Sequence, residues 1–95
     1  MKPRALVVDD DVGILQMVRD ILDSLNHYCD LAGDQGTAWK LFEARHYDYV
    51  LLDLEIPVEP GRLFRKENGM NLLKQISGHP AKNGVPVIVM TGHGK

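Results

Sequence analysis

The sequence predicts an α/β fold in which a doubly wound parallel sheet is covered by helices. Short apolar runs alternate along the chain with segments whose apolar residues recur at helical spacing. The apolar runs contain few polar residues, as is typical of parallel strands that are buried on both faces. Three of these runs end directly in side chains that can bind ligands: Asp9-Asp10-Asp11, Asp53 and Thr91. In an open parallel sheet, ligands bind at the edge where the strands end.

Apolar periodicity and turn residues define the individual elements. Strands are expected at Ala5–Val8, Tyr28–Ala32, Tyr49–Leu52 and Val85–Met90. Helices are expected at Val12–Leu25, Thr37–Ala44 and Met70–Ile76. Asp10 or Asp11 is well placed to cap the first helix, and Gly33-Asp34-Gln35-Gly36 predicts a turn before the second.

Length and composition restrict the class of protein. A chain of 95 residues fits one domain, and its 44% of hydrophobic residues is ordinary for a globular protein. The net charge of −2 gives no overall signature of nucleic-acid or membrane binding. The longest apolar runs fall far short of the ~20 residues that span a bilayer. The lone Cys29 cannot form an internal disulfide and the N-terminus does not resemble a signal peptide, so we expect a cytoplasmic location.

The aspartates after the first apolar run are the most informative local feature. Clustered carboxylates repel one another, so Asp9 and Asp10 indicate a site for a cation, and oxygen ligands suit Mg²⁺. A carboxylate such as Asp53 can attack a phosphoryl group and form an acyl phosphate, a transfer that needs a metal. The hydroxyl of Thr91 is suited to donate a hydrogen bond to a phosphoryl oxygen. Asp11 is expected to act only as a helix cap.

Taken in order, these residues resemble the receiver domain of two-component response regulators. The segments that carry the resemblance are Val7–Asp11, Val50–Pro57, Gly69–Leu73 and Val87–Gly94. The resemblance implies a flavodoxin-like sheet with strand order 2-1-3-4-5. It also implies Mg²⁺-dependent transfer of a phosphoryl group from a sensor histidine kinase to Asp53, which switches a downstream output. Met90–Gly94 looks most like receivers attached to transcriptional activators.

The resemblance further implies a role for each site residue. Asp53 would be the phosphoacceptor, and Thr91 would move toward the phosphoryl group and report its arrival. The ligands of Mg²⁺ would be Asp9, Asp10, Asp53 and the backbone carbonyl of Glu55. Glu55 and His93 would set the rate of autodephosphorylation, unless both are merely solvated loop residues. The chain would not be an enzyme but a phosphoacceptor that assists its own phosphorylation and dephosphorylation.

The first departure from the family pattern is the stretch from Val58 to Asn68. It separates Pro57 from Gly69, where the family usually has only a few residues. It is either a solvated loop on the rim of the site or a specificity loop for the kinase or effector. One of its basic side chains could also approach the phosphoryl group.

The second departure is the end of the chain, four residues past Thr91. A complete receiver continues through a fifth strand with an invariant lysine and its last helices, and Lys95 falls too early to be that lysine. We therefore expect residues 1–95 to be a receiver domain that is incomplete at its C-terminus. Its last strand would then be an unprotected sheet edge, which favours pairing, as in a homodimer, or aggregation. The output domain or effector would lie outside this chain, which would not itself bind nucleic acid or a membrane.

Two alternatives remain open. Val8–Gly13 looks superficially like the motif of haloacid dehalogenase-like phosphatases, with Asp9 as nucleophile, Asp11 as general acid and Thr91 as a later threonine. That alternative leaves Asp53 without a role. The other alternative is a degenerate receiver that acts as a binding module without being phosphorylated, and only the missing lysine supports it.

Overall fold

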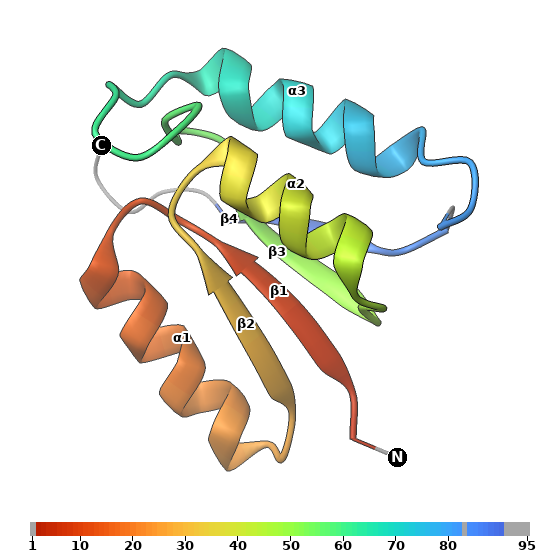
Figure 1. Cartoon of the computed structure of the whole chain (residues 1–95). Coiled ribbons are helices and arrows are strands. Elements are labelled where there is room, and N and C mark those ends of the chain that lie inside the picture. The colour runs from red at the N-terminus through yellow and green to blue at the C-terminus, as the bar shows by residue number, and fades with distance from the viewer. Residues whose placement is uncertain (1, 83, 91–95) are drawn as a thin grey trace.

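A computed structural model describes residues 2–82 and 84–90, which form a parallel sheet with helices on both faces (Figure 1). The elements in chain order are β1 (Arg4–Val8), α1 (Val12–Ser24), β2 (Tyr28–Ala32), α2 (Gln35–Ala44), β3 (Tyr49–Asp53), α3 (Lys66–Ser77) and β4 (Val87–Met90). The strand order is β2-β1-β3-β4, and each neighbouring pair is parallel. The predicted α/β fold class is therefore confirmed, and the described strands follow the first four positions of the order 2-1-3-4-5.

The two faces of the sheet bury two separate hydrophobic clusters. Leu6 and Val8 of β1 pack in the cluster that α2 and α3 cover, whereas Ala5 and Val7 pack with Leu15 of α1. Successive side chains of a strand point to opposite faces, so an uninterrupted apolar run is required where both faces are covered. This arrangement explains why the sequence of β1 does not alternate between polar and apolar residues.

β4 departs from the prediction that the apolar runs are buried on both faces. It lies at an edge of the described sheet, where Ile88 is 54% exposed and Val89 is 36% exposed. It begins at Val87 rather than at Val85. Pro86 has no N–H to donate to a neighbouring strand, although its carbonyl accepts a hydrogen bond from Val50 at 2.9 Å.

α2 and α3, which cover the same face of the sheet, begin earlier than the sequence predicted. α2 begins at Gln35 rather than Thr37, because the Asp34 side chain caps it by accepting a hydrogen bond from the Thr37 N–H at 2.7 Å. α3 begins at Lys66 rather than Met70, although no side chain caps it. Tertiary contacts fix its first turn instead: the Asn68 amide donates to the Ile56 carbonyl at 2.9 Å.

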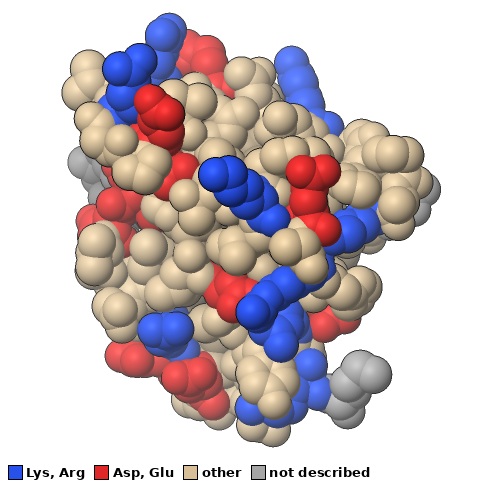
Figure 2. All heavy atoms as spheres, in the orientation of Figure 1, with Lys and Arg blue, Asp and Glu red and all other residues tan. Residues whose placement is uncertain are grey.

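The surface carries charges of both signs. Figure 2 shows acidic and basic side chains interspersed over one face, without a large patch of a single sign. This distribution agrees with the small net charge of −2. Among the described residues, no helix is both long and apolar enough to cross a lipid bilayer.

Gly69 marks a close approach between α3 and the segment that follows β3. Its N–H donates to the Leu54 carbonyl at 3.1 Å, and a Cβ at this position would overlap the Leu54 backbone. Only glycine lets the helix lie this close to the residue that follows Asp53. The packing of α3 therefore fixes the path of the chain as it leaves β3.

We predict that Gly69→Ala lowers the free energy of unfolding by about 1–3 kcal/mol, because the added methyl group has to displace the Leu54 backbone. In a helix that lacked this contact, the same change would stabilise the protein by up to about 1 kcal/mol. Urea denaturation followed by the fluorescence of Trp39 measures the effect. Asn71→Ala, at an exposed position of the same helix, is the matched control and should leave stability almost unchanged. Equal stability of Gly69→Ala and wild type would contradict the prediction.

Candidate functional site

Three carboxylates meet where β1 and β3 end. Asp9 and Asp10 follow β1, and Asp53 is the last residue of β3. β1 and β3 pair in parallel with Val8 opposite Leu52, so Asp9 and Asp53 are the next residues along two adjacent strands. Each of the three residues offers one carboxylate oxygen, and these oxygens lie within 4.8 Å of one another. The structure thus brings together the three aspartates that the sequence singled out.

Backbone donors orient two of these carboxylates in the same way. Asp9 Oδ1 accepts a hydrogen bond from the N–H of Asp11 at 2.9 Å, and Asp53 Oδ1 accepts one from the N–H of Glu55 at 3.2 Å. Each bond spans two residues, the geometry in which an aspartate closes a turn on its own backbone. Asp9 and Asp53 are buried and Asp10 is half-buried. The turns therefore hold the carboxylates in place at the end of the sheet.

This group of donors fits a hard divalent cation. Carboxylates this close repel one another, and burial weakens the screening by water. Mg²⁺ prefers oxygen ligands and is commonly held by one or two carboxylates together with waters. The three aspartates therefore supply the chemistry of a Mg²⁺ site, and their half-buried member, Asp10, lies toward solvent.

Asp11 has a different task from its two neighbours. Its Oδ1 accepts hydrogen bonds from the N–H groups of Gly13 at 2.8 Å and Ile14 at 3.2 Å, so it is the N-cap of α1. The prediction that Asp11 acts as a helix cap is confirmed, and of the two candidate caps Asp10 is excluded. The cap sets the direction in which α1 leaves the acidic site.

Of the remaining predicted site residues, only one is among the residues that the structure describes. Glu55 is partly buried in the loop that follows β3, and its N–H donates to Asp53. Thr91 and His93 lie outside the described residues.

The shifted pKa values belong to groups at the other end of the strands. Burial is the main reason that the pKa of Tyr47 is raised, and a hydrogen bond from its hydroxyl to Asp30 at 2.7 Å adds to the effect. Burial also raises the pKa of Tyr49, which begins β3. Tyr49 is the first residue of β3 and Tyr47 comes two residues before it, whereas Asp53 is the last residue of the strand.

Sequence reasoning missed the contribution of the first turn of α3 to this site. It assigned Asn68 to a loop, whereas the structure places it in α3 with its side-chain amide on the Ile56 carbonyl. Together with the contact between Gly69 and Leu54, this hydrogen bond holds the segment that follows Asp53. The available signal was a glycine inside a helical pattern, which often has a packing reason.

A model of the response regulator receiver domain matches residues 5–95. The chain belongs to this family. Over 93 residues it is 30% identical to the 3',5'-cyclic-nucleotide phosphodiesterase regA of Dictyostelium discoideum. That match covers 96% of the chain but only 11% of the length of this curated relative.

Solved structures of receiver proteins share the fold. The chemotaxis response regulator CheY4 of Vibrio cholerae superposes with a TM-score of 0.84 at 21% identity, over 100% of this chain and 72% of that one. The receiver domain of the sensor histidine kinase PA1611 from Pseudomonas aeruginosa PAO1 has a TM-score of 0.82 at 24% identity, over 98% of this chain and 70% of that one. The PA1611 structure has a magnesium ion coordinated in its active-site cleft.

Family membership indicates the general role of the chain as a signalling module. Receiver domains are signalling modules that bind Mg²⁺ at an acidic pocket and work with sensor histidine kinases and output domains. They are generally not enzymes. In this receiver domain, the acidic group lies at the same strand ends at which open α/β folds bind their ligands.

We predict that Asp10→Asn raises the free energy of unfolding in metal-free buffer, by on the order of 1 kcal/mol at low ionic strength, because it removes one of three repelling charges. Asp11→Ala is the comparison, and it should lower stability by about 1 kcal/mol through loss of the helix cap. Urea denaturation in the presence of a chelator measures both. Destabilisation by Asp10→Asn would contradict the assignment of Asp10 to the repelling cluster.

Proposed function

We propose that residues 1–95 act as one phosphorylatable receiver domain, in which Asp53 accepts a phosphoryl group from a sensor histidine kinase in a Mg²⁺-dependent reaction. Phosphorylation then switches a downstream output, for which we propose regulation of transcription, in the cytoplasm. The observation that carries the proposal is the convergence of the Asp9, Asp10 and Asp53 carboxylate oxygens within 4.8 Å. Family membership supports the reaction class.

The proposed Mg²⁺ ligands are the side chains of Asp9, Asp10 and Asp53 and the backbone carbonyl of Glu55. When bound, Mg²⁺ would neutralise charge on the phosphoryl oxygens. The magnesium ion in the cleft of the PA1611 receiver domain supports this choice of metal. The hydrogen bonds from the Asp11 and Glu55 N–H groups orient the carboxylates before any ligand arrives.

The reaction transfers a phosphoryl group from a phosphorylated histidine of the kinase to the unmodified carboxylate of Asp53. A carboxylate oxygen of Asp53 attacks the phosphorus of the kinase phosphohistidine. The P–N bond breaks, and the imidazole leaves with the electron pair of that bond. The product is an acyl phosphate on Asp53. Water later attacks the same phosphorus and breaks the P–O bond, which restores the carboxylate and releases inorganic phosphate.

The proposal includes two further roles. Thr91 donates a hydrogen bond to the phosphoryl group and reports its presence to the output side. Glu55 and His93 tune the lifetime of the acyl phosphate through the path of the hydrolytic water. The position of Glu55 in the loop directly after β3 supports this role. Its N–H donates a hydrogen bond to Asp53 Oδ1 at 3.2 Å.

The phosphatase alternative receives no comparable support. It needs Asp11 as a general acid, but the Asp11 carboxylate caps α1 through Gly13 and Ile14. It also gives no role to Asp53, which lies within the acidic group.

We predict that incubation with Mg²⁺ and a small acyl phosphate labels Asp53. Borohydride reduction of the aspartyl phosphate and peptide mass spectrometry identify the modified residue. Asp53→Asn should abolish the label, and Asp10→Asn should slow labelling by at least about tenfold because the cation is held less well. Asp11→Ala is the matched control and should be labelled at the wild-type rate once its folding is confirmed.

The site of modification distinguishes the three functions. Label at Asp9 would support the phosphatase and refute the proposed receiver chemistry. Absence of label in folded protein would leave only a binding module. Omission of Mg²⁺ should remove the label at Asp53 without unfolding the protein.

We also predict that Glu55→Ala and His93→Ala each change the rate of phosphate loss from phosphorylated Asp53 severalfold. The expected cause is altered access of water to the phosphorus, because the proposal assigns both residues to the path of that water. The decay of radiolabelled acyl phosphate after removal of the donor measures this rate. Decay at the wild-type rate in both variants would show that the two residues are solvated bystanders.

A further inference from the structure

The loop between β3 and α3 is closed on itself and fixed to the scaffold. Ile56 and Arg65 form an antiparallel bridge in which the Arg65 N–H donates to the Ile56 carbonyl at 3.0 Å. The first turn of α2 holds the other side, because the Gly36 N–H donates to the Val58 carbonyl at 2.9 Å. In Figure 1 this loop lies at the end of the sheet where β1 and β3 end. The loop therefore projects from the rim of the acidic site in a fixed position.

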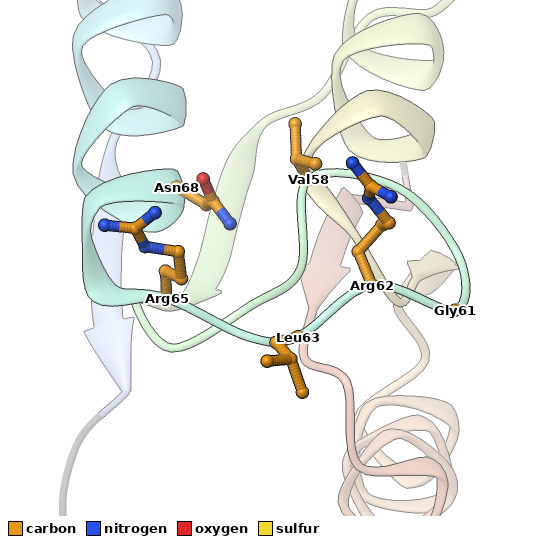
Figure 3. Close-up of a pocket in the computed structure, with 6 residues that line it drawn as sticks. All are labelled: Val58, Gly61, Arg62, Leu63, Arg65 and Asn68. Atoms are coloured by element: carbon orange, nitrogen blue, oxygen red, sulfur yellow. The ribbon is translucent and has the colours of Figure 1, made fainter.

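A cavity of about 520 Å³ opens within this loop, a size within the range of ligand sites. Among the described residues, its lining is formed by Val58, Gly61, Arg62, Leu63, Arg65 and Asn68, none of which is acidic. Figure 3 shows Arg62 and Arg65 on opposite sides of this space, with Val58 beside one and Asn68 beside the other. The guanidinium groups are thus placed to contact an anionic group that enters between them.

Neither arginine is committed to a strong partner. Arg62 lies 3.6 Å from the Glu59 carboxylate and Arg65 lies 3.9 Å from the Glu67 carboxylate, and all four side chains are well exposed. Exposed ion pairs of this length stabilise a protein little. A carboxylate on a partner can therefore take the place of either glutamate.

The apolar part of the loop indicates an occupant larger than a small molecule. Leu63 is 85% exposed, and Figure 3 shows its side chain pointing away from the space between the arginines. Phe64 and Val58 are also exposed. A small anion held between Arg62 and Arg65 would leave Leu63 in water. A protein surface would cover the arginines and Leu63 together.

We propose that the rim surface, formed by Val58, Arg62, Leu63 and Arg65, docks an acidic segment of the protein that donates the phosphoryl group. The partner would present carboxylates to the two guanidinium groups and an apolar hollow to Leu63. This inference rests on the proposed role of Asp53 as phosphoacceptor, because the rim surface belongs to the segment that follows Asp53. A donor docked there has its phosphohistidine held at the end of the sheet where Asp53 lies.

The test compares a small phosphodonor with a protein phosphodonor on the same variants. The small donor is acetyl phosphate with Mg²⁺, which needs the acidic site but not the rim surface. The protein donor is the autophosphorylated sensor histidine kinase that, within a panel of purified kinases, phosphorylates the wild-type chain fastest. The variants are Arg62→Glu/Arg65→Glu and Leu63→Ser. The charge-matched control is Lys40→Glu/Lys74→Glu, which reverses two exposed charges on α2 and α3.

The expected result is selective loss of transfer from the kinase. Arg62→Glu/Arg65→Glu should slow that transfer by at least about tenfold and reduce its dependence on salt, since the charges act on encounter and docking. Leu63→Ser should slow it without changing the salt dependence. Both should be labelled by acetyl phosphate within about twofold of wild type, and the control should match wild type with both donors. The fluorescence of Trp39, on α2, verifies that each variant is folded.

Three outcomes would overturn the inference. The rim variants could accept phosphoryl groups from the kinase at the wild-type rate. They could be slowed equally with acetyl phosphate, which would place the loop in the chemistry rather than in docking. The wild type could be labelled by acetyl phosphate and by no kinase in the panel. Failure of acetyl phosphate to label Asp53 in the wild type would instead refute the proposed function.

Discussion

Parallel pairing of β1 with β3 brings Asp9 and Asp53 to one edge of the sheet, because Val8 lies opposite Leu52 and each aspartate is the next residue along its strand. A shift of one residue in this register would turn the side chains of one strand to the wrong face. The register is secured from both sides of the sheet. Leu6 and Val8 are buried under α2 and α3, while Ala5 and Val7 are buried with α1. The hydrophobic core therefore determines where the carboxylates meet.

Bringing these carboxylates together costs electrostatic free energy, and backbone hydrogen bonds hold two of them in this arrangement. Asp9 and Asp53 each accept a hydrogen bond from the N–H two residues further along the chain. Such bonds fix the orientation of a carboxylate. The side chain of the neighbouring Asp11 is not part of this cluster, because it caps α1. What is left is a small group of oriented oxygens whose repulsion a bound divalent cation would relieve, and occupation of the site would then stabilise the fold.

The strands and the acidic site were predictable from the sequence because their signals are local. An apolar run that ends in aspartate specifies both the strand and the place of the ligand, and Asp11 before α1 specifies the cap. The start of α3 was not predictable, since Arg65 does not cap it and its first turn is held by Ile56 and Leu54. The missed exposure of β4 has the same origin. Whether a strand is covered depends on neighbours that its own residues do not encode.

The bridge between Ile56 and Arg65 separates the acidic site from the proposed docking surface. Before the bridge, the chain is held by the Gly69 contact at Leu54 and by the turn at Asp53, so substitutions there disturb the acidic site. Beyond the bridge, the projecting side chains of Arg62 and Leu63 can change without altering the hydrogen bonds that orient the aspartates. A loop closed in this way can vary its partner while the proposed phosphoacceptor, Asp53, stays fixed, as expected of loops on a rigid scaffold. The same closure reduces the conformational entropy that the loop loses on docking, because the loop is already ordered before a partner arrives.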